Sequence, residues 1–184
     1  MKATASLLVI TAALLTAACA EGRAIINVDV HSFMDAGADT LRYPPLPAPF
    51  IPGGTSVTAG SDTIRVLLPA GFGSSIAEST HVFAIVDLDN VIGNGNTTVD
   101  VFISDSASTI FSGTPAFSFG GAVSPATVTT DTVDVDLLST FNGLFTGSEV
   151  WIAFRAAVSA TTDVQGTVRL RRLDLRVVIQ DHVL

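Results

Sequence analysis

The amino-acid sequence predicts an all-β domain: an antiparallel two-sheet β-sandwich of the jelly-roll or immunoglobulin-like type, with about eight strands. Three observations favour this fold class. Apolar and polar residues alternate with a period of two in several successive segments. Pairs of turn-forming residues such as Gly53-Gly54 and Asn142-Gly143 separate these segments. Outside the N-terminal apolar run, no segment longer than about ten residues keeps the period of an α-helix.

The first half of the chain contains half-buried and fully buried strands. Three segments show the alternation of a strand with one buried face, and these are residues 24–31, 63–68 and 98–104. Residues 80–88 (THVFAIVDL) are apolar on both faces, which is typical of a central strand. Residues 44–52 are rich in proline and predict a stiff connector that crosses the sandwich, or alternatively an exposed recognition strip. The apolar side chains expected to pack under that connector are Leu46, Phe50 and Ile51.

The second half of the chain shows clear inward faces. The strand predicted at residues 149–158 carries Trp151 and Arg155 on one face. Its buried face is expected to consist of Val150, Ile152, Phe154 and Val158. Upstream, four residues expected to point inward change phase along the chain, which predicts two strands or a β-bulge. They are Val128, Val133, Val135 and Leu137. A short helical turn is expected within residues 137–144.

The last predicted strand changes phase in its middle. Its apolar residues before and after the change are Val168 and Leu170, then Leu173, Leu175, Val177 and Ile179. A β-bulge at Arg171-Arg172 would keep all of them on one buried face. The opposite face carries Arg169, Arg171, Arg172 and Arg176. Two interpretations of these arginines are open: they pair with outward Asp residues on neighbouring strands, or they form a stripe that docks an anion or a partner.

One acidic loop offers oxygen ligands of the kind that calcium prefers. The candidate ligands are Asp87, Asp89, Asn90, Asn94 and Asn96. The segment departs from an EF-hand loop, because Val91 occupies a required ligand position and the closing Glu is missing. The alternative is a hairpin loop rich in turn residues, since Asn94-Gly95 is a strong hairpin signal.

The sequence carries no recognisable catalytic motif. The histidines, His31, His81 and His182, lie on separate segments without the spacing of zinc ligands. No Gly-x-Ser-x-Gly nucleophile elbow is present. We therefore expect a protein that is not an enzyme and that needs no cofactor apart from the possible calcium ion. An enzyme whose site is assembled from distant loops is the remaining alternative.

The N-terminus has the pattern of a secretory signal peptide. Lys2 supplies a positive charge, residues 7–15 form a short apolar core, and small residues follow up to Cys19. The segment Leu15-Thr16-Ala17-Ala18-Cys19 resembles the lipobox of bacterial lipoprotein precursors. That resemblance implies cleavage before Cys19, lipidation of its thiol by several acyl chains and, because Ala20 follows, localisation in the outer membrane. Cys19 is the only cysteine, so no disulfide within the chain competes for it.

These features divide the chain into a signal peptide (1–18), a lipidated N-terminus with a short tether (19–23) and a single β-sandwich domain (24–184). The mature chain has eight arginines against seventeen acidic residues, a net charge of −9, which argues against nucleic acid as a partner. We expect an exported protein that lipid anchors to a membrane, on its periplasmic or outer-surface side. Its predicted role is non-catalytic binding or structure, as an accessory subunit to another envelope or membrane protein. A calcium-assisted ligand-binding or adhesion module is the alternative.

Overall fold

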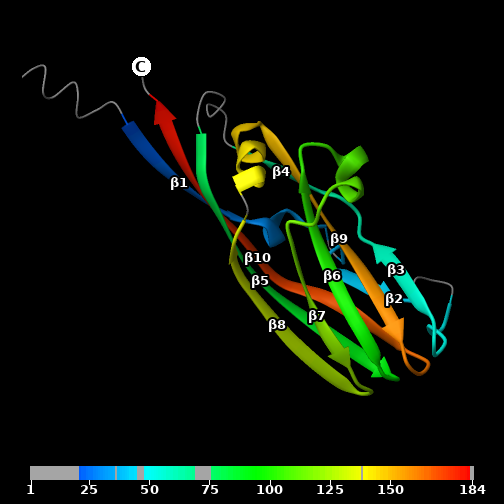
Figure 1. Cartoon of the computed structure of the whole chain (residues 1–184). Helices are drawn as coiled ribbons and strands as arrows, with labels where there is room; N and C mark the ends of the chain where they lie inside the picture. Colours follow the sequence, from blue (N-terminus) through cyan, green and yellow to red (C-terminus); the bar gives the residue numbers. More distant parts are fainter. Residues whose placement is uncertain (1–20, 36, 45–47, 69–75, 138, 183–184) are drawn as a thin grey trace, which may run out of the picture.

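Two antiparallel β-sheets pack face to face in the computed structural model, which describes residues 21–35, 37–44, 48–68, 76–137 and 139–182 (Figure 1). The elements in chain order are β1 (Glu21–Asp29), η1 (Val30–Phe33), β2 (Thr40–Tyr43), β3 (Ser56–Gly60), β4 (Ile64–Leu67), β5 (Ile76–Ile92), β6 (Gly95–Ser104), η2 (Ala107–Ser112), β7 (Phe117–Val123), β8 (Thr127–Asp136), η3 (Ser139–Thr146), β9 (Glu149–Ala160) and β10 (Gln165–His182). The η elements are 3₁₀ helices. Within the described ranges, no helix has the length and apolar character needed to span a bilayer.

The strand order identifies a jelly roll. The first sheet has the order β1-β10-β5-β8, with β2 also beside β10, and we call it the long sheet. The second has the order β3-β9-β6-β7, with β4 also beside β9, and we call it the short sheet. Strands β1 and β2 lie one after the other along the same edge of β10, and β3 and β4 lie in the same way along β9. Each sheet is therefore four strands wide. From one position to the next the chain changes sheet, except between β6 and β7, and this is the topology of a jelly roll. It confirms the predicted sandwich of about eight strands.

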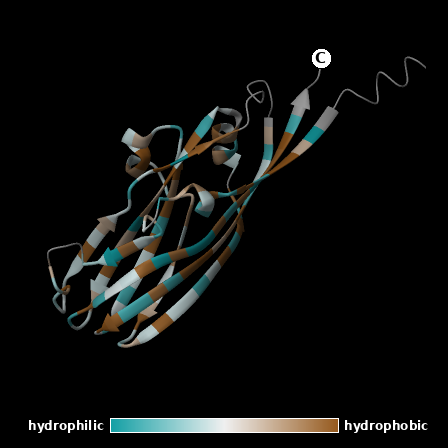
Figure 2. Ribbon diagram, turned by 180° about the vertical axis from the view of Figure 1, so that it is seen from behind, coloured by the Kyte–Doolittle hydropathy of each residue, from teal (hydrophilic) through white to brown (hydrophobic). Residues whose placement is uncertain are grey.

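The core lies between the sheets and follows the alternation of the sequence. In β9 the four residues predicted to be inward are buried, while Trp151 and Arg155 lie on the other face, as predicted. Figure 2 shows the same alternation of apolar and polar residues along the other strands. The core also contains a polar pair, in which the Tyr43 hydroxyl donates to Oδ1 of Asn90 at 3.4 Å. Burial of this phenol raises the pKa of Tyr43 to about 12.

The predicted β-bulge in the last strand is confirmed. The pairing of β10 with β5 shifts register between Leu170 and Arg172. Arg171 is therefore the extra residue, and both Leu170 and Leu173 remain buried on the inner face. Without the bulge, Arg172 would point into the core, where an unpaired charge is costly. The bulge thus places two adjacent arginines on the outer face of the long sheet.

The prediction for Val128 is wrong. Its side chain is 61% exposed, and β8 is one continuous strand that pairs with β5 in regular register. The register places Val128 opposite Asp89. The physical reason is that the unbroken alternation of β8 puts Val128 on the outer face of the long sheet, away from the core. Val135 does share the inner face with buried Val82, but it is 36% exposed because β8 is an edge strand. The helical turn predicted after this strand is present as η3.

The Asn94-Gly95 pair does not close a β-hairpin. Strand β5 pairs with β10 and β8, whereas β6 pairs with β7 and β9, so the link between β5 and β6 crosses from the long sheet to the short sheet. The positive φ angle of this link lies at Gly93, with a value of 78°. A favourable local turn sequence was therefore used for a crossover, because burial across the two sheets decides the pairing.

Two predicted connecting segments, the proline-rich stretch and the N-terminal tether, lie partly within the described residues. The proline-rich stretch does join the long sheet (β2) to the short sheet (β3). Ile51 is fully buried, as predicted, whereas the prediction for Phe50 is wrong, because its side chain is 38% exposed. Leu46 lies outside the described residues, as do Cys19 and the signal peptide. At the N-terminus, β1 already begins at Glu21, so it includes part of the predicted tether. Strand β1 ends at Asp29, whose carboxylate accepts the backbone N–H of Ser32 and caps η1.

Candidate functional site on the outer face of the long sheet

The outer face of the long sheet consists of rows of side chains that cross β1, β10, β5 and β8. The register pairs Arg176 with Asn27 on one side and with His81 on the other. One full row contains Asn27, Arg176, His81 and Asp136, and the next contains Asp29, Asp174, Phe83 and Asp134. Residues from four distant segments therefore meet on one surface.

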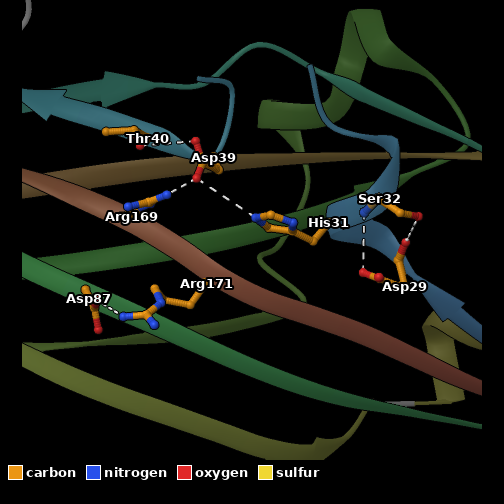
Figure 3. A network of polar contacts seen from close by, with 8 residues as sticks. All are labelled: Asp29, His31, Ser32, Asp39, Thr40, Asp87, Arg169 and Arg171. Atoms are coloured by element: carbon orange, nitrogen blue, oxygen red, sulfur yellow. Dashed lines mark hydrogen bonds and ion pairs between the residues drawn. The ribbon is translucent and has the colours of Figure 1, made fainter. Parts of the chain in front are cut away.

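Three of the four arginines on β10 form ion pairs within the domain. Nε of Arg169 donates to Asp39 at 3.1 Å, and Nη1 of Arg171 donates to Asp87 at 2.9 Å (Figure 3). These two pairs agree with the interpretation that the arginines bind aspartates of neighbouring segments. Nε of Arg172 donates at 2.7 Å to Asp174, which lies on the same strand.

The ion pairs lower the pKa values of both aspartates on neighbouring segments. Partial burial opposes ionisation of Asp39, but hydrogen bonds from Arg169 and Thr40 outweigh it and hold the pKa below its ordinary value. For Asp87, the hydrogen bond from Arg171 lowers the pKa most, burial opposes it, and Thr130 adds a second hydrogen bond. Both carboxylates are thus ionised partners of fixed arginines, and this part of the stripe is electrically balanced.

A shallow depression of about 440 Å³ lies where the two rows meet. It is lined by Asn27, Val28, Asp29, His81, Phe83, Arg172, Asp174, Leu175 and Arg176. The ring of Phe83 lies in it, with the guanidinium carbon of Arg172 4.9 Å from the ring centroid, a cation–π distance. Arg176 is exposed and forms no ion pair with any residue of the described part of the chain. Arg176 therefore differs from its three neighbours in having a guanidinium open to a partner.

His81 is held by two carboxylates of β8. Its Nε2 lies 2.7 Å from Asp134 and its Nδ1 lies 2.9 Å from Asp136. The hydrogen bond to Asp136 raises the pKa of His81 most, slight burial opposes it, and Asp134 raises it further. Because both ring nitrogens are occupied, this imidazole has no free nitrogen with which to activate a nucleophile. The nitrogens also point to opposite sides of the ring, so they cannot bind one metal ion together with both carboxylates.

The five residues considered for calcium lie on different surfaces. Asp87 and Asp89 belong to the outer face of the long sheet, and Asp87 already binds Arg171 and Thr130. Asn90 is buried between the sheets and donates to the carbonyl oxygen of Gly93 at 2.7 Å. Asn94 lies in the crossing link, and Asn96 is exposed on β6 of the short sheet. No group of three or more His, Cys, Asp or Glu residues in the described ranges is arranged to hold a metal ion.

The Phe83 depression and the contacts of His81 are not among the features predicted from the sequence. A partial signal was present, because His81 and Phe83 alternate with buried residues and Asp134 and Asp136 share one face of their strand. The missing information was the register between β5 and β8, which places His81 opposite Asp136 and Phe83 opposite Asp134.

Comparisons with known proteins match the chain only at the level of three-dimensional structure. No family model and no curated protein matches it. It is similar to a chain in the structure of infectious bursal disease virus Gx strain, with 7% identity and a TM-score of 0.46, over 89% of this chain and 38% of the viral chain. A xylan-binding module is similar with 13% identity and a TM-score of 0.39, over 84% of this chain and 97% of the module. The adhesin domain of Lys-gingipain from Porphyromonas gingivalis is similar with 12% identity and a TM-score of 0.38, over 83% of this chain and 97% of that domain. The assignment of the jelly roll rests on the strand order of the chain itself.

Proposed function

We propose that this protein is a lipid-anchored, non-catalytic binding domain of the bacterial envelope, with outer-membrane attachment, that holds a membrane protein through the Phe83 depression. The anchor is supported by the resemblance of residues 15–19 to a lipobox and by the position of Cys19 as the only cysteine. Multiple acyl chains are needed for stable attachment, since one buried chain alone holds a protein only marginally.

The observation that carries the binding role is the environment of Arg176. This exposed guanidinium lines a depression that the ring of Phe83 also lines, while the other three arginines of β10 are neutralised within the domain. A guanidinium binds a carboxylate or carbonyl acceptor with directional hydrogen bonds, and an adjacent aromatic ring adds apolar contact. Arginine and aromatic residues are also the types that contribute most binding energy at protein interfaces.

The non-catalytic character is supported by the state of His81. It is the titratable side chain of the depression whose ordinary pKa lies nearest neutrality, and its two nitrogens are both engaged by Asp134 and Asp136. The depression thus offers a fixed pattern of charge and hydrogen-bonding groups, which suits recognition.

The test is co-purification from gently solubilised native membranes with the variant Arg176→Gln and the control Arg42→Gln. Arg42 is an exposed arginine on β2 of the same sheet, outside the depression, so both variants remove one surface charge. We expect a defined protein to co-purify with the wild type and with Arg42→Gln, and to be lost or reduced at least tenfold with Arg176→Gln, as for a contact of about 1.4 kcal/mol. A wild-type protein that always purifies alone, or equal retention by both variants, would refute the proposal.

A further inference from the structure

We infer that the domain stands on the bilayer at the end where β1 begins, with its strands along the membrane normal and its sheet faces turned sideways. The partner of the Phe83 depression is then the extramembrane part of a neighbouring membrane protein. This inference rests on the lipid anchor proposed above and adds to it an orientation, a height and a partner class.

The chain between the proposed lipid anchor and the fold is very short. Only Ala20 separates Cys19 from Glu21, the first residue of β1. Two residue steps of extended chain reach at most about 7 Å. The start of β1 is therefore held within a few ångströms of the lipid surface once Cys19 is acylated.

The ends of three strands of the long sheet lie together at the start of β1. Glu21 pairs with His182 of β10, and Gln180 of β10 pairs with Ile76 of β5, so three strand ends meet there. Figure 1 shows these three strands extending together beyond the short sheet. The links β5–β6, β7–β8 and β9–β10 lie at the opposite end. Because β10 spans 18 residues, that far end is roughly 60 Å away along the strands.

If the domain lay flat on the membrane on its long sheet, the outer face of that sheet would touch the lipid headgroups. The outer face of the long sheet exposes Asp134 and Asp136, and the mature chain has a net charge of −9, so contact with anionic headgroups is unfavourable. Near the anchor, by contrast, a row of this face carries the 55% exposed Ile25 beside Val178. Ile25 lies four residues after Glu21, about 14 Å along β1, so this exposed aliphatic side chain lies nearer the anchored end than Asp134 and Asp136 do.

The height of the depression follows from the strand rise. Asn27 and Asp29 line it and lie six and eight residues after Glu21 on β1. At about 3.4 Å per residue, the depression is roughly 20–27 Å along the strand from the anchored end. A partner that reaches it sideways must extend a similar distance out of the same membrane. It must present a hydrogen-bond acceptor to Arg176 and an apolar side chain to Phe83.

The test uses fluorescence transfer from single labelled cysteines, since the thiol of Cys19 is consumed by the anchor. Ser79→Cys lies on β5 near the anchored end and Ser124→Cys lies at the β7–β8 link, and both positions are exposed. The acylated protein is placed in vesicles of phosphatidylcholine and anionic phosphatidylglycerol that contain acceptor-labelled lipid. We expect the donor at residue 124 to sit about 40 Å higher than the donor at residue 79, and transfer to be strong only from residue 79. Equal transfer from both positions would overturn the upright orientation.

A matched variant separates tethering from direct adhesion. Twelve Gly and Ser residues inserted between Ala20 and Glu21 add a flexible linker with an end-to-end distance of roughly 19 Å. We expect this insertion to reduce transfer from residue 79, whereas unchanged transfer would show that a face of the domain adheres to lipid by itself and would overturn the inference. Mass spectrometry of the mature N-terminus tests the anchor independently: a chain without acyl groups refutes the proposed function, while an acylated chain with equal transfer refutes the orientation alone.

Discussion

Gly93 lies in the link between β5 and β6, where the backbone of another segment leaves no room for a side chain. Its φ angle is 78°, and a Cβ atom at this position would lie 1.8 Å from the carbonyl oxygen of Asp163. Gly54 has the same φ angle of 78°, but no atom lies within 4 Å of its Cβ position. The variants Gly93→Ala and Gly54→Ala therefore separate the cost of left-handed backbone from the cost of a close approach.

We expect Gly54→Ala to lower the free energy of unfolding by about 1 kcal/mol, the cost of placing an L-residue in the left-handed region. Gly93→Ala has that cost and a steric one. A carbon atom approaches a carbonyl oxygen no closer than about 3.3 Å. The β5–β6 link and the β9–β10 link, which contains Asp163, must therefore separate by more than 1 Å. This movement would break neighbouring contacts, such as the 2.8 Å hydrogen bond from the Asn94 N–H to the Thr162 hydroxyl. The expected total for Gly93→Ala is about 3–5 kcal/mol.

Urea denaturation and thermal melts, both monitored by the fluorescence of Trp151, the only tryptophan, measure both variants. In a domain of this size, 1 kcal/mol corresponds to a change of about 2–4 °C in Tm. Gly93→Ala should therefore melt roughly 10 °C below the wild type, and Gly54→Ala only a few degrees below it. Equal losses for the two variants would show that the link does not approach Asp163 as described.

Three further predictions concern pH dependence and the core. Because Asp136 and Asp134 raise the pKa of His81, the stability that this histidine contributes is present below its unfolded-state pKa of about 6.5 and is lost as pH rises through the folded-state pKa. Thermal melts over this range should show a falling midpoint in the wild type and a flatter profile in His81→Gln. Tyr43 is the only tyrosine, so the phenolate absorbance of the folded protein should rise only near pH 12. The free energy of unfolding should fall as pH rises above the unfolded-state pKa of about 10, because the unfolded chain then loses a proton that the folded chain keeps. Phenolate absorbance that rises at pH 10 in the folded protein would contradict the burial of Tyr43. Ile152→Ala should lower the free energy of unfolding by about 2–5 kcal/mol, because Ile152 is fully buried. Leu67→Ala, at a position 59% exposed, should lower it by less than about 0.5 kcal/mol. Similar losses for the two variants in urea denaturation would contradict the assigned core.

The faces of strands could be predicted well because they depend on local information. In β9 the alternation of the sequence assigns Val150, Ile152, Phe154 and Val158 to the core, and all four are buried. Ala153 breaks the alternation, because it is buried on the other face with Phe102 and Ile110. The bulge at Arg171-Arg172 was predictable for the same reason, since a change of phase within an otherwise apolar strand requires an extra residue.

Errors arose where the position of a strand in its sheet matters. The apolar side chain of Val128 predicts an inward position and a change of phase before Val133, but β8 keeps one register with β5 and leaves Val128 on the outer face beside Asp89. The turn propensity of Asn94-Gly95 is real, yet the strands on either side of it belong to different sheets. Local propensity describes a few residues, whereas sheet membership depends on which distant segments together cover the core.

By itself, the sequence determined the all-β class, the buried face of most strands, the bulge in the last strand and the types of charge available on the surface. Only the tertiary structure decided that the sandwich is a jelly roll and that Arg176, His81 and Phe83 share a surface with residues of β1 and β8. The physical reason is the range of the interactions. The two-residue period is set by the geometry of a single strand, whereas the register between strands is set by burial and hydrogen bonding among segments as far apart as Asn27 and Arg176.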